Sequence, residues 1–216
     1  MTRELGYAPI VDLRKIMELN KWIVGASAFK NYGNAYQISE LLNGVDTDLA
    51  KRLKIFSDLL NLNHLDRIEK EVQSLMAMRN RQYSNPLPEL TVKPVINDFL
   101  REFGTIRDNH ALFQYKLAKW QFNNMNYALS LISLQEALIT YACKLEGVDW
   151  QIKDIRDEVK CNVKRILCKE LSDCYSDIRQ YRNAVAHSLK NDSSAGSIIN
   201  KLRNALDVVG KHIGNS

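Results

Sequence analysis

Apolar residues recur at helical spacing along almost the whole of this 216-residue chain. Ile16, Leu19, Trp22 and Ile23 form one such stripe, and residues 125–145 carry another. A stripe with spacings of three and four residues is typical of one face of an α-helix. No run alternates apolar and polar residues between hairpin turns, which is the pattern of a strand. The sequence therefore predicts an all-α fold of roughly eight helices.

Turn residues divide this pattern into segments. Gly33-Asn34 and Asn43-Gly44 each end a helix, and Asp46 or Thr47 can cap a long helix that continues to Met78. The segment 84–88 holds two prolines, which lack a backbone donor and restrict the preceding residue, so it predicts an extended link. Later helices are expected over 92–103, 111–122, 125–145, 154–167 and 171–189, and after a break at 191–194. We expect an N-terminal helical region at 1–85 and a second region at 86–216, or one compact domain overall.

The net charge of +5 is unevenly distributed along the chain. Residues 1–159 hold 20 Lys and Arg against 20 Asp and Glu, whereas residues 160–216 hold 10 against 5. A local basic surplus is a weak indication of a phosphate-bearing partner. The alternative is a solvated helix face, and charge alone favours that alternative.

The cysteines and the N-terminal residues indicate in which cellular compartment the protein is expected. Cys143, Cys161, Cys168 and Cys174 form no Cys-x-x-Cys pair, so neither a zinc site nor another cofactor is predicted. The first twenty residues carry six charged side chains, which argues against a cleaved signal peptide. The uncharged run at residues 121–135 is too short and too polar to span a bilayer. We expect a reduced, cytoplasmic protein without a membrane partner.

One helical stretch, residues 177–188, is richer in reactive side chains than its neighbours. Asn183 and His187 are one turn apart, Arg179 lies one turn before Asn183, and the long side chain of Arg182 can reach the same patch. The buried stripe of this helix is expected to consist of Ile178, Tyr181, Val185 and Leu189. The helix therefore presents arginine, asparagine and histidine together, without a carboxylate or thiol partner beside them.

These residue types suit the cleavage of RNA better than the hydrolysis of an amide. The 2′-OH of RNA is its own nucleophile, so the protein needs to supply only proton transfer and stabilisation of an anionic phosphorus centre. An imidazole that titrates near neutrality suits the first task and a guanidinium suits the second. No metal ion is required by this scheme. A purely structural alternative is that Arg182 pairs with Asp173 or Asp177 while His187 interacts with the helix C-terminus.

The sequence of residues 182–187, Arg-Asn-Ala-Val-Ala-His, resembles the Arg-polar-x-x-x-His motif of HEPN-domain ribonucleases. Residues 117–139 are similar to the helix that precedes this motif in the CRISPR-associated CARF–HEPN ribonucleases of type III systems. The opening from Trp22 to Leu42 is similar to helices that precede the HEPN core in the same group. The resemblance implies a HEPN-like helical bundle with additional N-terminal helices, and a HEPN ribonuclease core within residues 86–216.

The resemblance also implies a function and a role for each matching residue. Arg182 would stabilise the scissile phosphate, Asn183 would orient the motif and His187 would be the general acid and base. Two copies of the motif would meet across a homodimer interface and cut single-stranded RNA, leaving a 2′,3′-cyclic phosphate, in CRISPR-linked antiviral defence. Two alternatives stay open: a non-catalytic all-α module for dimerisation or nucleotide binding, and a HEPN toxin of a toxin–antitoxin pair.

Further cations are expected along the RNA path. These are Arg179, Lys190 and Arg203, with Lys201 as a weaker candidate. His64, His110 and His212 are expected to be structural or exposed. Such ribonucleases usually carry an N-terminal Rossmann-like sensor domain, which this chain has no βαβ pattern to form, so the chain is expected to be a HEPN portion or a stand-alone member. A sensor domain would then be a partner outside this chain.

Overall fold

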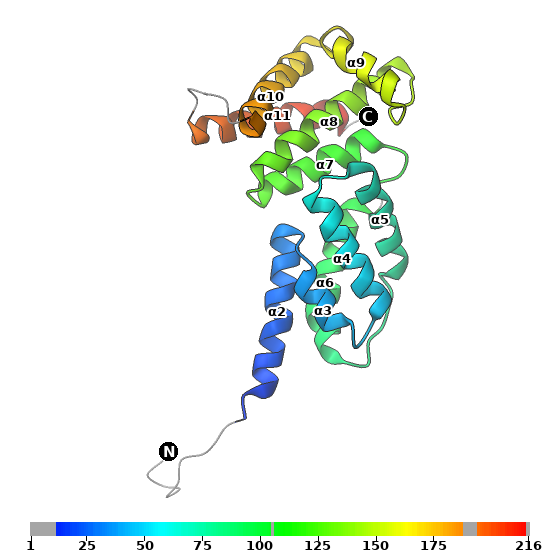
Figure 1. Ribbon diagram of the computed structural model, residues 1–216, viewed down its shortest axis with the longest axis vertical. Coiled ribbons are helices and arrows are strands. Elements are labelled where there is room, and N and C mark those ends of the chain that lie inside the picture. Colours follow the sequence, from blue (N-terminus) through cyan, green and yellow to red (C-terminus); the bar gives the residue numbers. More distant parts are fainter. Residues whose placement is uncertain (1–11, 105, 188–193, 215–216) are drawn as a thin grey trace, which may run out of the picture.

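A computed structural model describes residues 12–104, 106–187 and 194–214 of the protein, with the backbone alone at 185–187. Within these ranges the chain forms ten helices and no strand, which confirms the predicted all-α fold (Figure 1). The helices are α2 (Arg14–Tyr32), α3 (Tyr36–Leu42), α4 (Thr47–Asn61), α5 (Leu65–Met78), α6 (Pro86–Phe103), α7 (His110–Asn123), α8 (Tyr127–Glu146), α9 (Lys153–Ile166), α10 (Lys169–His187) and α11 (Ala195–Ile213). No helix in the described ranges is long and apolar enough to cross a membrane.

The first hydrophobic core is built by α2 to α6 and by one face of α7. Aromatic rings fill its centre, because the ring of Phe99 lies 5.6 Å from Phe29 and 5.1 Å from Phe56, measured between centroids. Both pairs meet edge to face, the geometry that aromatic rings prefer. The helices of this core occupy one end of the elongated molecule (Figure 1).

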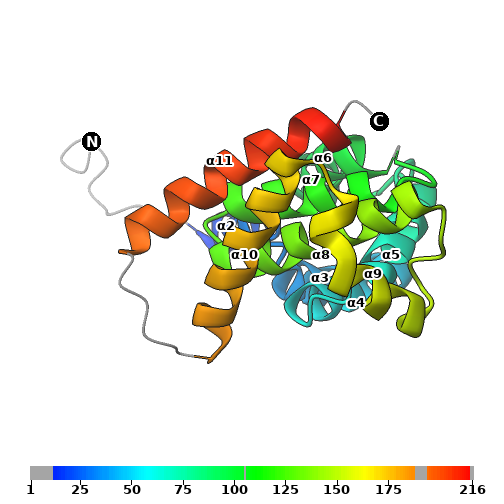
Figure 2. The ribbon, with the colours of Figure 1, turned by 90° about the horizontal axis from the view of Figure 1, so that it is seen from above.

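The second hydrophobic core is built by α8 to α11 and by the other face of α7. Phe113 and Leu117 of α7 face the first core, whereas Ala111, Tyr115 and Ala118 face the second. Helices α10 and α11 lie beside each other and pack with α8 (Figure 2). Helix α7 thus contributes side chains to both cores. The predicted division into two regions, 1–85 and 86–216, stays a prediction.

The long helix predicted from residue 47 to Met78 is wrong, because two helices occupy this range. Asn63 has a φ of 51°, in the left-handed region that interrupts a right-handed helix. Asn63 also accepts a hydrogen bond of 3.1 Å from the Ser133 hydroxyl of α8. The turn between α4 and α5 therefore anchors the first core to the second, which the uninterrupted apolar stripe did not reveal.

The extended link predicted at residues 84–88 is also wrong at its second half, since α6 begins at Pro86. The side chain of Asn85 caps this helix by accepting a hydrogen bond of 2.9 Å from the Leu87 amide. Prolines are tolerated in the first turn of a helix because the missing amide hydrogen would have no partner there. Pro94 lies further inside the same helix.

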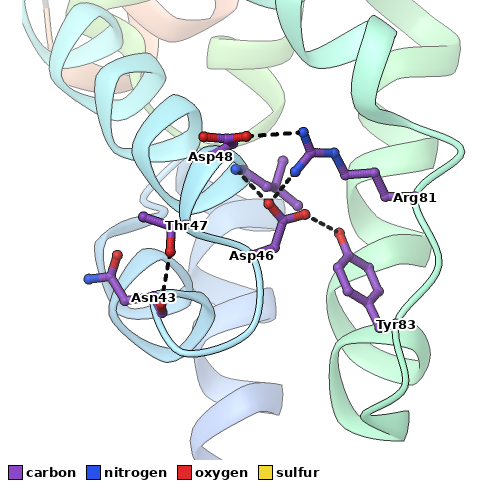
Figure 3. Close-up of polar contacts among 7 residues, drawn as sticks. Asn43, Asp46, Thr47, Asp48, Arg81 and Tyr83 are labelled. Atoms are coloured by element: carbon purple, nitrogen blue, oxygen red, sulfur yellow. Dashed lines mark hydrogen bonds and ion pairs between the residues drawn. The ribbon is translucent and has the colours of Figure 1, made fainter.

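The α3–α4 turn and the α5–α6 connection are joined by a polar cluster (Figure 3). Asp46 caps α4 by accepting a hydrogen bond of 3.0 Å from the Leu49 amide, as predicted for this position. Its carboxylate also contacts Arg81, which in turn pairs with Asp48 at 3.5 Å. Burial, with a smaller contribution from Asp46, raises the pKa of Tyr83 to about 12. One buried carboxylate therefore holds together segments 35 residues apart.

Candidate active site

Helix α10 carries the predicted motif and is fixed in place by its apolar stripe. Leu171, Tyr175, Ile178 and Tyr181 are buried at spacings of three and four residues. This stripe packs in the second core against α8 and α11. Ile178 and Tyr181 thus occupy the core as predicted, whereas Val185 and Leu189 lie outside the described side chains.

Arg182 and Asn183 lie together in the last described turn of α10. Both side chains are half-buried, and Nη1 of Arg182 donates a hydrogen bond of 3.1 Å to Oδ1 of Asn183. Arg179 is exposed one turn before Asn183. Half-burial and the contact to Asn183 restrict the Arg182 guanidinium, which leaves its remaining donors for an anionic group.

His187 is the last residue of α10, and its side chain lies outside the described residues. Lys190 lies outside them altogether. The placement of His187 one helical turn after Asn183 follows from the backbone, because α10 continues to residue 187. That the imidazole lies together with the Arg182 guanidinium on one patch stays a prediction.

The two predicted cations of α11, Arg203 and Lys201, lie over aromatic rings of two different helices. Arg203 is exposed, and its guanidinium lies 5.6 Å from the ring centroid of Phe122 at the end of α7. Lys201 instead covers the ring of Tyr181, with Nζ 5.3 Å from the centroid. The hydrogen bond to Tyr181, followed by the charges of Tyr181 and Asp177, raises the pKa of Lys201. Of the two predicted cations, Lys201, the weaker candidate, therefore lies beside the motif helix, whereas Arg203 lies beside α7.

Helix α10 also carries a row of carboxylates, of which Asp173 and Asp177 were considered above only as partners of Arg182. Glu170, Asp173 and Asp177 follow one another at spacings of three and four residues, and all three line a groove between α10 and α11. The spacing itself was the signal that could have revealed them. Cys174 lies between them, and burial, with smaller contributions from these acids, raises the pKa of its thiol to about 11.

The other histidines are engaged in polar contacts away from the motif. His110 lies 2.8 Å from Glu69 of α5, and its ring centroid lies 4.9 Å from that of Trp150. His212 contacts Glu170 at 3.1 Å, and His64 lies 3.7 Å from Asp66. In the part of the chain that the structure describes, no group of three or more His, Cys, Asp or Glu side chains could hold a metal ion. The metal-independence of the proposed chemistry stays a prediction.

Comparison with known proteins relates the chain to a class of CRISPR-associated proteins. Residues 18–109 match the family described as CRISPR-associated protein MJ1674, second domain. This range covers most of the first core and ends one residue before α7 begins.

One relative is the CRISPR-associated protein MJ1674 of Methanocaldococcus jannaschii, which is 30% identical to this chain over 215 residues. The alignment covers 96% of this chain and 33% of that protein, so the chain spans about a third of the length of the curated relative it matches. The chain is thus a homologue of one part of that protein, and the similarity extends through both cores.

Proposed function

We propose that this chain is a metal-independent endoribonuclease that cuts single-stranded RNA and acts in CRISPR-linked antiviral defence. The observation that carries the proposal is the half-buried pair of Arg182 and Asn183 near the end of a well-packed helix, one turn before a histidine. The similarity to a CRISPR-associated protein supports the biological setting.

The chemistry divides between two side chains. The imidazole of His187 removes the proton of the 2′-OH and returns a proton to the leaving oxygen, because an imidazole can act both as base and as acid. The guanidinium of Arg182 donates paired hydrogen bonds to the phosphate oxygens, where negative charge builds up in the transition state. Asn183 holds the guanidinium through its 3.1 Å contact and is a positioning residue. The products are a 2′,3′-cyclic phosphate and a 5′-OH.

A homodimer would bring two copies of the motif into one composite site. Ala184 follows Asn183 directly and is half-buried, and a small side chain beside the polar groups allows a second helix to come close. Arg179 and Lys190 would extend the cationic surface along the RNA strand. A sensor domain is a further partner that would lie outside this chain.

Cleavage of a fluorescently labelled single-stranded RNA by His187→Ala tests the proposal. Loss of a general acid and base reduces the rate by about 10²–10⁴. His64→Ala is the matched control. The His64 side chain is half exposed, and the residue lies in the α4–α5 turn, far from the motif in the sequence. Gel filtration should give the same size for both variants and the wild type.

Four outcomes separate the proposal from its rivals. Equal cleavage by His187→Ala and the wild type contradicts it, as does complete loss of wild-type cleavage when a chelator is added. RNA binding or dimerisation without any cleavage indicates the non-catalytic module. Toxicity on expression that is relieved by His187→Ala, and silenced by a co-expressed partner, indicates the toxin of a toxin–antitoxin pair.

A further inference from the structure

A groove with two compartments lies where helices of the first core meet those of the second, around the connection between α8 and α9. The larger compartment has a volume of about 560 Å³ and the smaller one about 390 Å³. Both volumes fall in the range of small-molecule sites in proteins. Trp150 lines both compartments, together with Asp66 of α5 and Gln151. We call this site the Trp150 groove.

Two planar side chains in the Trp150 groove are fixed in place by their neighbours. The half-buried indole of Trp150 is contacted by His110 of α7, at 4.9 Å between ring centroids, and by the guanidinium of Arg156 of α9, 5.6 Å from its centroid. Arg156 donates a hydrogen bond of 3.1 Å to the Thr140 hydroxyl of α8 and pairs with Glu136 of the same helix. Bases of single-stranded RNA stack on aromatic rings and on arginine planes. The larger compartment, which Trp150 and Arg156 both line, therefore suits a base.

A buried amide lines the same compartment without a partner. Gln114 of α7 is 1% exposed, and its Oε1 accepts no hydrogen bond from any residue that the structure describes. A buried acceptor without a partner lowers the stability of the fold, so packing alone does not explain a glutamine at this position. Every RNA base carries both donors and acceptors on its polar edge, and a side-chain amide can pair with either kind.

The charges that the protein leaves unpaired in the Trp150 groove are mainly positive. Three exposed cations form no ion pair within the described ranges, two at the smaller compartment and one at the larger: Lys70, Arg107 and Lys153. Three of the four lining carboxylates are each engaged by a histidine or an arginine: Glu69, Asp66 and Glu136. The fourth, Asp108, is exposed. Cations beside a planar apolar surface favour a ligand that combines a ring with phosphate.

We propose that the Trp150 groove binds nucleotides, with the base against Trp150 and Arg156, its polar edge at Gln114 and the phosphates at the unpaired cations. A free mononucleotide and single-stranded RNA carry the same base and phosphate groups, so both are tested below. The α8–α9 connection and the described end of α10 lie on opposite sides of the second core (Figures 1 and 2). The groove is therefore a second site, and its existence does not depend on the proposed cleavage.

The first experiment measures binding to the full chain by isothermal titration calorimetry, with AMP, UMP, inorganic phosphate and the RNA tetranucleotide AUAU as probes. The RNA is titrated into His187→Ala to prevent cleavage. Trp150→Ala should weaken the binding of AMP, UMP and the RNA by about 5- to 150-fold, the range measured for loss of one base–aromatic stack. Tyr32→Ala is the matched control, because Tyr32 is an aromatic side chain that is 64% exposed on α2 and does not line the groove.

A second variant separates binding from folding. Gln114→Leu should weaken the binding of AMP and UMP by about 2- to 13-fold, the value of one hydrogen bond. Its midpoint of urea unfolding should stay the same or rise, because the substitution removes a buried oxygen without a partner. A glutamine with only a structural role gives the opposite result: lower stability and unchanged binding. That result overturns the inference.

The probes also decide which ligand the groove takes. Tighter binding of the tetranucleotide than of AMP and UMP supports RNA as the ligand, and equal binding supports a free nucleotide. No nucleotide binding, binding of inorganic phosphate as tight as that of AMP, or equal losses in Trp150→Ala and Tyr32→Ala overturns the inference. Binding that survives Trp150→Ala and is lost in Arg182→Ala belongs to the motif, which overturns the inference and leaves the proposed function standing. Nucleotide binding that depends on Trp150, together with no cleavage by the wild type, overturns the proposed function and leaves the groove standing.

Discussion

The two cores of this protein share one helix but are built from different side chains. The first core holds a cluster of interlocking aromatic rings among its aliphatic side chains, with centroid distances from 4.7 to 6.0 Å: Phe29, Phe56, Phe99, Phe103, Phe113 and Trp120. The second core is mainly aliphatic, with Tyr175 and Tyr181 on its motif helix. All four cysteines and the candidate site belong to the second half of the chain.

This difference indicates a division of labour between support and chemistry. Ring clusters tolerate little displacement, because each ring is held by several others at fixed angles. A binding groove needs the opposite condition, a gap that packing leaves open. The first core would therefore hold α7 in place, and α7 would in turn position the helices that carry Arg182 and line the Trp150 groove.

The largest effect is expected from Phe99→Ala, since this ring contacts Phe29, Phe56, Phe103 and Trp120. Removing a buried phenylalanine costs about 3–5 kcal/mol of unfolding free energy, from lost burial and from the cavity that remains. Urea unfolding followed by tryptophan fluorescence measures this loss. Leu90→Ala is the control, because Leu90 lies on the same helix, α6, but is 71% exposed, so its loss should change stability little.

Leu138→Ala provides the counterpart in the second core, where Leu138 is fully buried on α8. We expect both core variants to shift one common transition, because α7 contributes to each core. Two separate transitions, each moved by only one of the variants, would show that the cores fold independently.

The next largest loss of stability is expected from replacing a glycine by alanine, at two glycines that share the same backbone conformation. Gly33 ends α2 with a φ of 67°, and Gly147 ends α8 with a φ of 68°. A Cβ at Gly33 would lie 2.2 Å from Cδ2 of Leu60 and 2.9 Å from Trp120, whereas a Cβ at Gly147 meets nothing within 4 Å. Gly33→Ala should therefore cost about 2–4 kcal/mol, combining backbone strain with overpacking.

Gly147→Ala should cost only the strain of the left-handed conformation, on the order of 1 kcal/mol. Thermal unfolding of the two variants side by side measures the difference. Equal losses would mean that the first core yields to an added methyl group as easily as an open turn does, which contradicts its role as a rigid support.

Much of this fold could be predicted from local signals. Gly33 and Asp46 mark helix ends because their conformations and hydrogen bonds are decided within one turn of the chain. Asn63 could not be read in this way, since its left-handed conformation is accompanied by a contact to Ser133 that lies 70 residues away. The start of α6 at Pro86 was missed for another reason: the same proline residues are compatible with an extended link and with a first helical turn.

The candidate site also combines features that the local sequence predicts with features that depend on how the helices pack. The helical period places Arg179, Asn183 and residue 187 on one side, and the structure brings Arg182 into contact with Asn183. Period alone could not place Arg203 and Lys201 relative to that helix, because their positions depend on how α11 crosses α10 and α7. The structure places Lys201 against Tyr181 and Arg203 against Phe122.

The smallest losses of stability are expected from removing helix N-caps. One cap is taken from each half of the chain, at α4 and at α11. Asp46 caps α4 with a carboxylate that is 8% exposed and that also contacts Arg81, whereas the exposed Ser194 caps α11 by accepting a bond of 3.2 Å from the Ser197 amide. Loss of a cap costs about 0.5–2 kcal/mol. Asp46→Ala should fall at the upper end, because it also leaves the Arg81 guanidinium without its buried partner, and Ser194→Ala at the lower end.

Asp46→Asn separates the two contributions of the first cap. Asparagine keeps the acceptor oxygen for the Leu49 amide but removes the charge that faces Arg81. Urea unfolding at low and at 1 M salt measures both parts, because salt screens the exposed Asp48–Arg81 contact more than a buried one. If Asp46→Asn is as damaging as Asp46→Ala, the link to Arg81 outweighs the cap, and the first core is held by contacts between distant segments even at its helix ends.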